Sequence, residues 1–338
     1  MSTGTGLSRP KSPHHSKSPA PISSLSKPGV ARKVSSGRSN EAETATQAMR
    51  PPIDWFRVIP YFLLHAAAVT AFWVGVSPIA ASVCGAMIAL RVFALTAFYH
   101  RYFSHRAFKT SRWFQFVGAV LGASSAQRGP IWWAAHHRAH HKHSDQPDDL
   151  HSPVQHGFWF SHMGWFLTRE AYATDKSLVR DWLKFPELRF LDRFDFFVPA
   201  VFAAGMFGLG ELAHYVWPAS DTSGWQMLVW GYLLSTLAVY HITYFVNSLA
   251  HVVGKRRFRT EDDSRNNLWL ALLTFGEGWH NNHHRYMASA RQGFYWWEID
   301  ITYYILCMLS WFGLVWDLKP VPKSILAEGQ QSDGEPRG

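Results

Sequence analysis

Four long apolar runs constrain the fold of this chain more than any other feature of its sequence. They cover residues 59–76, 78–99, 194–217 and 225–246. Each run is long enough to cross a hydrocarbon core of about 30 Å as an α-helix. The two runs of each pair are joined by a short connection without Lys or Arg. We therefore expect an all-α integral membrane protein with four transmembrane helices in two hairpins.

The composition supports this class. Hydrophobic residues make up 47% of the 338 residues, with 17 Trp and 24 Phe, and charged residues only 17%. The formal net charge of +9 lies in the N-terminal tail and beside the apolar runs, with no motif that reads DNA or RNA. Such a basic surface suits anionic lipid, so we expect membrane lipid and no nucleic acid among the partners.

The basic residues also predict orientation and domain boundaries. The positive-inside rule places both termini and every His-rich segment on the cytoplasmic side. Residues 1–50, rich in Ser, Pro, Lys and Arg, predict a disordered basic cytoplasmic tail. Residues 51–320 are expected to form one domain with a cytoplasmic helical cap, and residues 321–338 a disordered C-terminal tail. An apolar segment at 303–316 predicts a cytoplasmic or interfacial helix, with a fifth span as the alternative.

A histidine-rich run, Trp132 to Asp145, lies between the two hairpins. His137, His140 and His141 stand at i, i+3 and i+4 and so share one face of a helix. Three imidazoles on one face can form half of a metal site. The alternative is a solvated basic tract that binds metal only adventitiously.

Further histidines follow other apolar segments and favour the metal site. They are His100 and His105, then His251 with Asn247 four residues before it, then His280, His283 and His284. A pair five residues apart, such as His100 and His105, diverges on a continuous α-helix, so we expect the helix to end or bend there. Nine imidazoles exceed the needs of one ion and imply two ions. Such a set suits Fe, Zn, Cu or Ni, and spacing alone does not choose among them.

The motifs HRYFSH, HHRAHHKHSD, FVNSLAH and GEGWHNNHH, in this order, resemble those of the membrane-bound fatty acid desaturases, in particular the stearoyl-CoA desaturase-like branch. The resemblance runs from about residue 98 to residue 318. It implies a centre of two Fe ions that uses O2 to introduce a cis double bond, at the delta-9 position, into a saturated acyl chain. The implied ligands are His100, His105, His137, His140, His141, His251, His280, His283 and His284, with Asn247 acting through a water.

The resemblance also implies an apolar substrate channel and an external electron donor. Trp132, Trp133 and Tyr244 are candidates to line the channel, although each could instead belong to an interfacial aromatic belt. The sequence has no HPGG haem motif, only Cys84 and Cys307, and no GxGxxG-containing βαβ unit. We therefore expect cytochrome b5, a ferredoxin or a rubredoxin-like protein to supply the electrons.

The chain departs from the animal enzymes where those handle coenzyme A. Ala135 and His136 replace an Arg-Asp pair, and the later basic pair reads Arg169 and Glu170. Arg169 stays a candidate substrate contact, and both fatty acyl-CoA and lipid-linked acyl chains stay open as substrates. Two other functions also remain open, a fatty acyl hydroxylase with the same centre and a membrane protein that binds or transports metal.

Overall fold

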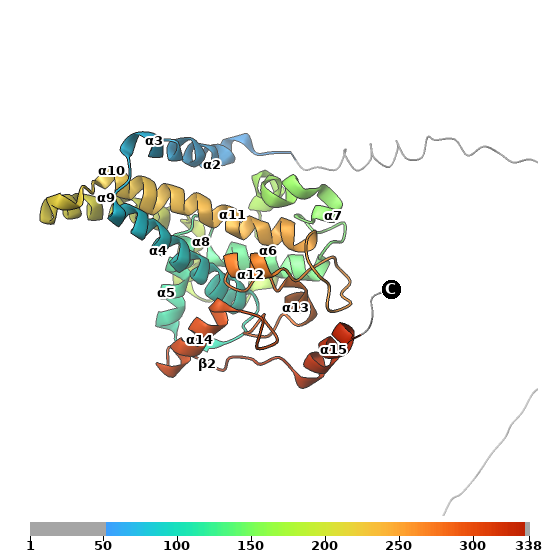
Figure 1. The fold of residues 1–338 in the computed structure, drawn as a ribbon. Helices are drawn as coiled ribbons and strands as arrows, with labels where there is room; N and C mark the ends of the chain where they lie inside the picture. Colours follow the sequence, from blue (N-terminus) through green and yellow to red (C-terminus); the bar gives the residue numbers. More distant parts are fainter. Residues whose placement is uncertain (1–51, 335–338) are drawn as a thin grey trace, which may run out of the picture. The chain divides into compact units, whose positions relative to one another are not determined.

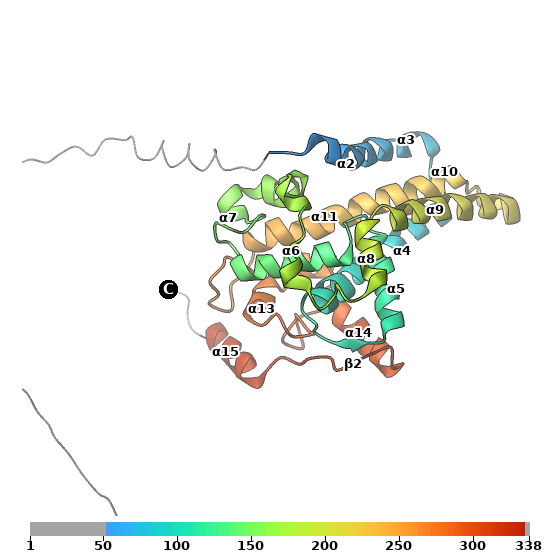
Figure 2. The ribbon, with the colours of Figure 1, turned by 180° about the vertical axis from the view of Figure 1, so that it is seen from behind.

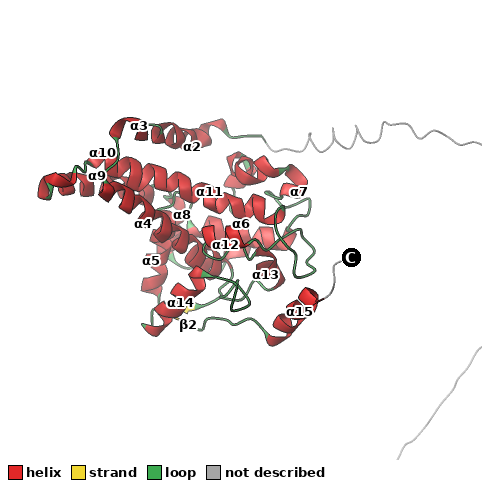
Figure 3. Cartoon of the chain, viewed as in Figure 1, coloured by secondary structure: helices red, strands yellow, loops and turns green. Residues whose placement is uncertain are grey.

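The computed structural model describes residues 52–334, and the predicted N-terminal tail lies outside them. The described chain is mostly helical (Figure 3). Its strands, β1 (Lys109–Thr110) and β2 (Val315–Trp316), form one antiparallel pair in which Lys109 faces Trp316. The prediction of a helical protein is therefore confirmed.

Four helical segments are long and apolar enough to cross a membrane: Trp55–Val74, Pro78–Ser104, Phe197–Val216 and Gly224–His251. They match the four predicted runs, although the second and fourth extend further. The first comprises α2 (Trp55–Ala68) and α3 (Ala71–Val74), and the third is α9 (Phe197–Val216). The second joins α4 (Pro78–Ala94) to the π-helix η1 (Leu95–Ser104). The fourth comprises α10 (Gly224–Gln226), the π-helix η7 (Met227–Leu234), α11 (Ser235–Ser248) and the 3-10 turn η8 (Leu249–His251).

The two interhelical connections meet at one end of these segments. Ser77 caps α4 by accepting a hydrogen bond from the Ala80 amide at 3.1 Å. The same hydroxyl lies 2.8 Å from the hydroxyl of Thr222 in the second connection. The second and fourth segments then lead away from this end and finish at the first and third histidine clusters along the chain.

Arg91 lies within the second segment and is fully buried, as expected for a charge that faces the protein interior. Its guanidinium donates to the Thr236 hydroxyl at 2.7 Å and also to Ser235. The charged group thus joins α4 to α11.

The remaining helices surround the far ends of the second and fourth segments (Figures 1 and 2). They are α5 (Arg112–Ala123), α6 (Pro130–His143), α7 (Pro153–His156), α8 (Pro186–Arg193), α12 (Leu268–Leu273), α13 (His280–Arg285), α14 (Ile301–Trp311) and α15 (Lys323–Gly334). Short π or 3-10 turns are η2 (Phe160–Gly164), η3 (Trp165–Leu167), η4 (Glu170–Tyr172), η5 (Lys176–Val179) and η6 (Pro218–Ser220).

The main hydrophobic core lies where η1 meets α5 and α6. Close packing there depends on two glycines of α5. A Cβ atom at Gly118 would lie 2.0 Å from the Phe98 ring, and one at Gly122 would lie 2.2 Å from the Tyr99 ring. These contacts fix the helix that carries His100 and His105 against the core.

The sequence predicts a disordered tail from residue 321, whereas the structure has helix α15 at Lys323–Gly334. Helix α15 packs the buried Ile325 against Phe258 and Phe294. Arg285 also donates to Glu328 at 2.9 Å. The segment is mostly polar, so its sequence predicts little burial, and its order comes from these contacts with the rest of the chain.

Candidate metal centre

The nine predicted histidines form two groups of converging ring nitrogens. The five-histidine group contains His100, His105, His137, His141 and His283, and the four-histidine group contains His140, His251, His280 and His284. Within each group the candidate ligand atoms lie within 4.8 Å of one another. Each group could hold a metal ion.

The π-helix η1 explains how His100 and His105 join one group. The His105 amide donates to the His100 carbonyl at 3.3 Å, which is the i→i+5 bond of a π-helix. This wider turn brings residues five apart toward the same side, and the helix also ends at Ser104. The expected break in the helix is therefore present, with a π-helical turn that the spacing alone did not predict.

Each HxxHH motif supplies both groups. Helix α6 gives His137 and His141 to the five-histidine group and His140 to the four-histidine group. Helix α13 gives His283 to the first of these groups and His280 and His284 to the second. Helices α6 and α13 therefore face each other across the centre.

The nitrogen spacing in the five-histidine group carries information on coordination. Consecutive Nε2 atoms of His105, His137, His141, His283 and His100 are separated by 2.9, 3.0, 2.9 and 3.0 Å. Two nitrogens each about 2.1 Å from one ion lie about 3.0 Å apart at a right angle and about 3.4 Å apart at a tetrahedral angle. The nitrogens of this group are therefore close enough to share one ion.

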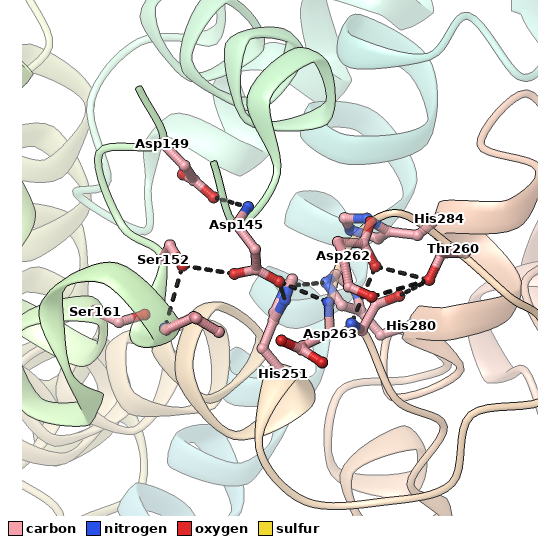
Figure 4. A network of polar contacts seen from close by, with 12 residues as sticks. Asp145, Asp149, Ser152, Ser161, His251, Thr260, Asp262, Asp263, His280 and His284 are labelled. Atoms are coloured by element: carbon pink, nitrogen blue, oxygen red, sulfur yellow. Dashed lines mark hydrogen bonds and ion pairs between the residues drawn. The ribbon is translucent and has the colours of Figure 1, made fainter. Parts of the chain in front are cut away.

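Three of the four histidines in the four-histidine group are held by carboxylates, and Figure 4 shows two of them, His251 and His284. Nδ1 of His251 donates to Asp145 at 2.8 Å, Nδ1 of His140 donates to Asp149 at 3.0 Å, and Nδ1 of His284 donates to Asp262 at 2.6 Å. Metal-binding histidines commonly donate their second ring nitrogen to a carboxylate in this way.

These carboxylates fix which ring nitrogen is free. Burial alone would raise the pKa of Asp145, but hydrogen bonds led by that from His251 lower it to about 2. The pKa values of Asp149 and Asp262 are also lowered against the effect of burial, chiefly by His140 and His284 respectively. Ionised carboxylates only accept hydrogen bonds, so each of these three rings carries a proton on Nδ1, and Nε2 is the nitrogen directed to a metal ion.

Most of the imidazoles outside the spanning segments are neutral at pH 7. Burial, with the neighbouring imidazoles, lowers the pKa of His284 to about 4, even against the opposing effect of Asp262. The same causes lower the pKa of His105, His137, His141, His280 and His283 well below the usual value. At His140 burial is outweighed by Asp149, and the pKa is raised. In addition, Nε2 of His284 is buried without a hydrogen-bond partner in the described structure, as a ligand to a metal ion would be.

Two arginines position the first histidine pair. Arg138 donates to the carbonyls of Phe103 at 2.7 Å and Ser104 at 2.8 Å, where η1 ends. Arg101 is buried and donates to Glu277 at 3.1 Å, and Glu277 in turn contacts Nδ1 of His100.

Sequence reasoning did not single out Arg138, Glu277 or the three aspartates. The available signal was proximity, because Asp145, Asp149 and Glu277 lie in or beside the histidine motifs.

An apolar cavity of about 490 Å³ reaches the five-histidine group at His137. Trp132, Trp133, Tyr244 and Asn247 all line it. The cavity therefore brings the three predicted channel aromatics together beside the centre. Its size lies within the range of small-molecule sites.

Arg169 lies apart from this cavity, with an exposed side chain. The cavity is lined instead by Arg57 and Arg128, whose guanidinium carbons each lie 4.8 Å from the ring centre of Tyr172. Each also has a nearby carboxylate, since Arg57 lies 3.6 Å from Asp54 and Arg128 lies 3.3 Å from Asp195.

Two imidazole groups beside an apolar cavity, at one end of four apolar helices, define a helical protein of the membrane type with a candidate two-metal centre. A sequence model of the fatty acid desaturase family matches residues 71–307. The chain belongs to the fatty acid desaturase family, whose members are oxidoreductases.

Several relatives are named desaturases. The chain is 34% identical to the sn-1 stearoyl-lipid 9-desaturase of Anabaena variabilis, over 83% of this chain and 99% of that protein. It is 39% identical to the chloroplastic palmitoyl-monogalactosyldiacylglycerol delta-7 desaturase of Arabidopsis thaliana, over 70% of this chain and 60% of that protein. It is 37% identical to an acyl-CoA 5-desaturase of Anemone leveillei, over 76% of this chain and 74% of that protein.

Proposed function

We propose that this protein introduces a cis double bond at the delta-9 position of a saturated fatty acyl chain, using O2 and two electrons from an external donor. The observation that carries the proposal is the pair of histidine groups beside an apolar cavity. The names of its relatives support acyl-lipid and acyl-CoA substrates, and the match over 99% of a stearoyl-lipid 9-desaturase favours a lipid-linked chain and the delta-9 position.

Two iron ions are proposed as the cofactor, one in each histidine group, with Asn247 contributing through a water. The convergence of five imidazoles in one group exceeds the four ligands of a structural zinc site. Imidazole nitrogen is a suitable ligand for iron. When bound, the iron pair would supply the oxidising power that removes hydrogen from two neighbouring methylenes.

The protein's own residues would position the chain and exclude water. Trp132, Trp133 and Tyr244 provide aromatic walls for the acyl chain beside His137. A hydrogen bond of 3.1 Å from Gln127 to Thr243 joins two other residues that line the cavity. These walls would hold one pair of methylenes near the centre, because the contribution of a protein to such chemistry is position.

The electron donor is proposed to be cytochrome b5, a ferredoxin or a rubredoxin-like protein that approaches the cytoplasmic side. The proposed sidedness follows from the basic residues that flank the apolar segments. Both termini and the metal centre would then lie on that side.

The proposal is tested by expressing the protein in cells whose lipids are saturated and mapping new double bonds by mass spectrometry. We expect delta-9 monounsaturated chains, with none in cells that carry the His140→Ala or His283→Ala variant. A hydroxy fatty acid as the main product would support a hydroxylase instead. Metal accumulation without any acyl product would support a metal-binding or transport protein.

A further inference from the structure

Helix α14 presents an apolar face that the described residues leave uncovered. Tyr304, Met308 and Trp311 recur at i, i+4 and i+7 and therefore lie on one side of the helix. Trp311 is 81% exposed, and Phe312, directly after the helix, is 73% exposed. On the opposite side Leu306 is fully buried in the main core. Large exposed apolar patches commonly mark a binding surface.

The chemistry of this face fits the boundary of a bilayer. Residues 301–316 contain no charged side chain, and two tryptophans, Trp296 and Trp297, precede the helix with exposed rings. Tryptophan and tyrosine concentrate where membrane meets water. With 11 residues the helix is too short to cross the bilayer, which excludes the fifth span considered from the sequence.

The attachment of α14 fixes its depth. The hydroxyl of Thr302, in its first turn, lies 2.7 Å from the hydroxyl of Thr96 in the second spanning segment. Thr96 lies about 27 Å along that segment from Pro78 at 1.5 Å per residue. A hydrocarbon core is about 30 Å thick, so the joint lies near its boundary. Figure 1 shows α14 running across the direction of α4 rather than alongside it.

We propose that α14 is an in-plane membrane anchor, whose face of Tyr304, Met308, Trp311 and Phe312 contacts the lipid at the interface beside the four spans. The occupant of the face is the bilayer itself. Helix α14 has no charged face of its own, because its opposite side is buried in the protein core, and its exposed apolar side chains would bury into the boundary between headgroups and acyl chains.

The anchor is joined to the metal centre by buried polar contacts. Asp300 caps α14 by accepting from the Tyr303 amide at 3.0 Å. The same carboxylate accepts from Arg101 at 3.0 Å, and Arg101 also donates to Glu277, which contacts His100. The position of α14 in the bilayer therefore bears on the five-histidine group through Asp300, Arg101 and Glu277.

The test is a nitroxide depth measurement on the full chain in nanodiscs of phosphatidylcholine and phosphatidylglycerol. The native Cys84 and Cys307 are replaced by serine, and single labels are placed by Met308→Cys, Leu209→Cys and Glu261→Cys. Leu209 is exposed on the spanning helix α9 and reports the hydrocarbon core, whereas Glu261 is exposed in a polar loop and reports water. Tyr304→Cys repeats the measurement on the same face of α14 if the Met308 variant does not fold.

We expect the label on α14 to collide with O2 more often, and with a water-soluble nickel chelate less often, than the label at Glu261, at a depth between the two controls. A label as accessible to the nickel chelate as that at Glu261 would overturn the proposal. A label shielded from both reagents, with spin–spin broadening, would also overturn it and indicate a second copy of the chain on this face. A depth equal to that of Leu209 would contradict an interfacial position. None of these outcomes depends on desaturase activity.

Discussion

The two histidine groups achieve the same convergence of imidazoles by different means. In the four-histidine group, three rings are each oriented by an aspartate. In the five-histidine group, among the described residues, only His100 has a carboxylate partner, and the other rings pack edge to face on one another. The rings of the four-histidine group are therefore oriented mainly by aspartates. Those of the five-histidine group are oriented mainly by one another.

This difference predicts different sensitivities. A group of four ligands oriented by aspartates depends on each aspartate, because one carboxylate fixes both the tautomer and the direction of a ring. A group of five rings in mutual contact distributes that constraint among its members. The following variants are ordered from the largest expected effect to the smallest.

Removing one ligand from either group has the largest expected effect. His283→Ala and His284→Ala are a matched pair, because the residues are adjacent on α13 but belong to different groups. Each should lower the double bonds formed per chain by more than about 100-fold, since even a lost outer partner costs about 10- to 100-fold. Near-normal activity in either variant would show that the replaced histidine is not a metal ligand.

The carboxylate variants separate the two groups. Asp262→Asn should weaken iron binding by roughly 10- to 100-fold, and Glu277→Gln should weaken it less. Asp263→Asn is the control, because this neighbouring side chain is partly exposed and pairs with Arg256. Iron affinities measured by competition with a chelator show which variant loses more. A larger loss for Glu277→Gln than for Asp262→Asn would contradict the expected difference between the two groups.

Arg138→Lys tests how the end of η1 is held. A lysine cannot make the forked contacts to the Phe103 and Ser104 carbonyls, and a hydrogen bond to a charged group contributes about 1.5–3 kcal/mol. We expect a Tm lower by several degrees in thermal unfolding, at about 2–4 °C per kcal/mol. Arg106→Lys, whose exposed side chain lies 3.4 Å from Asp181, should leave Tm within about 1 °C.

The smallest effects are expected around the apolar cavity that we propose as the substrate site. Arg169→Ala should leave KM for the acyl substrate unchanged, because its side chain lies apart from the cavity. Arg128→Ala should raise KM by up to about five-fold, the limit for a contact worth about 1 kcal/mol. A larger increase in KM for Arg169→Ala than for Arg128→Ala would instead support Arg169 as the substrate contact that the sequence resemblance suggests.

The sequence predicted the helices and the nine histidines because both signals are local. Apolar runs of span length and the i, i+3, i+4 spacing act within one segment. The sequence could not predict that His140 belongs to a different group from His137 and His141. This division depends on which histidines of α13 and of the fourth spanning segment lie next to each ring in the folded chain. The π-helical turn at His100 could not be predicted either. The five-residue spacing of His100 and His105 requires only that the helix ends or bends there.

Contacts between distant segments explain the other differences. Asp262 holds His284 across a loop, and Arg138 binds carbonyls of η1, so neither role has a local pattern. Helix α15 is polar and is ordered by Arg285 and the core around Phe258. Such partners become visible only when the chain is folded.

The central claim is that two separate histidine groups each hold one ion. Iron content per chain, measured by mass spectrometry on protein purified in lipid, tests it most directly. We expect about two iron ions in the unchanged protein, as two groups with one ion each require, and a loss of one in the His283→Ala and His284→Ala variants. A single ion in the unchanged protein, or another metal in place of iron, would contradict the account.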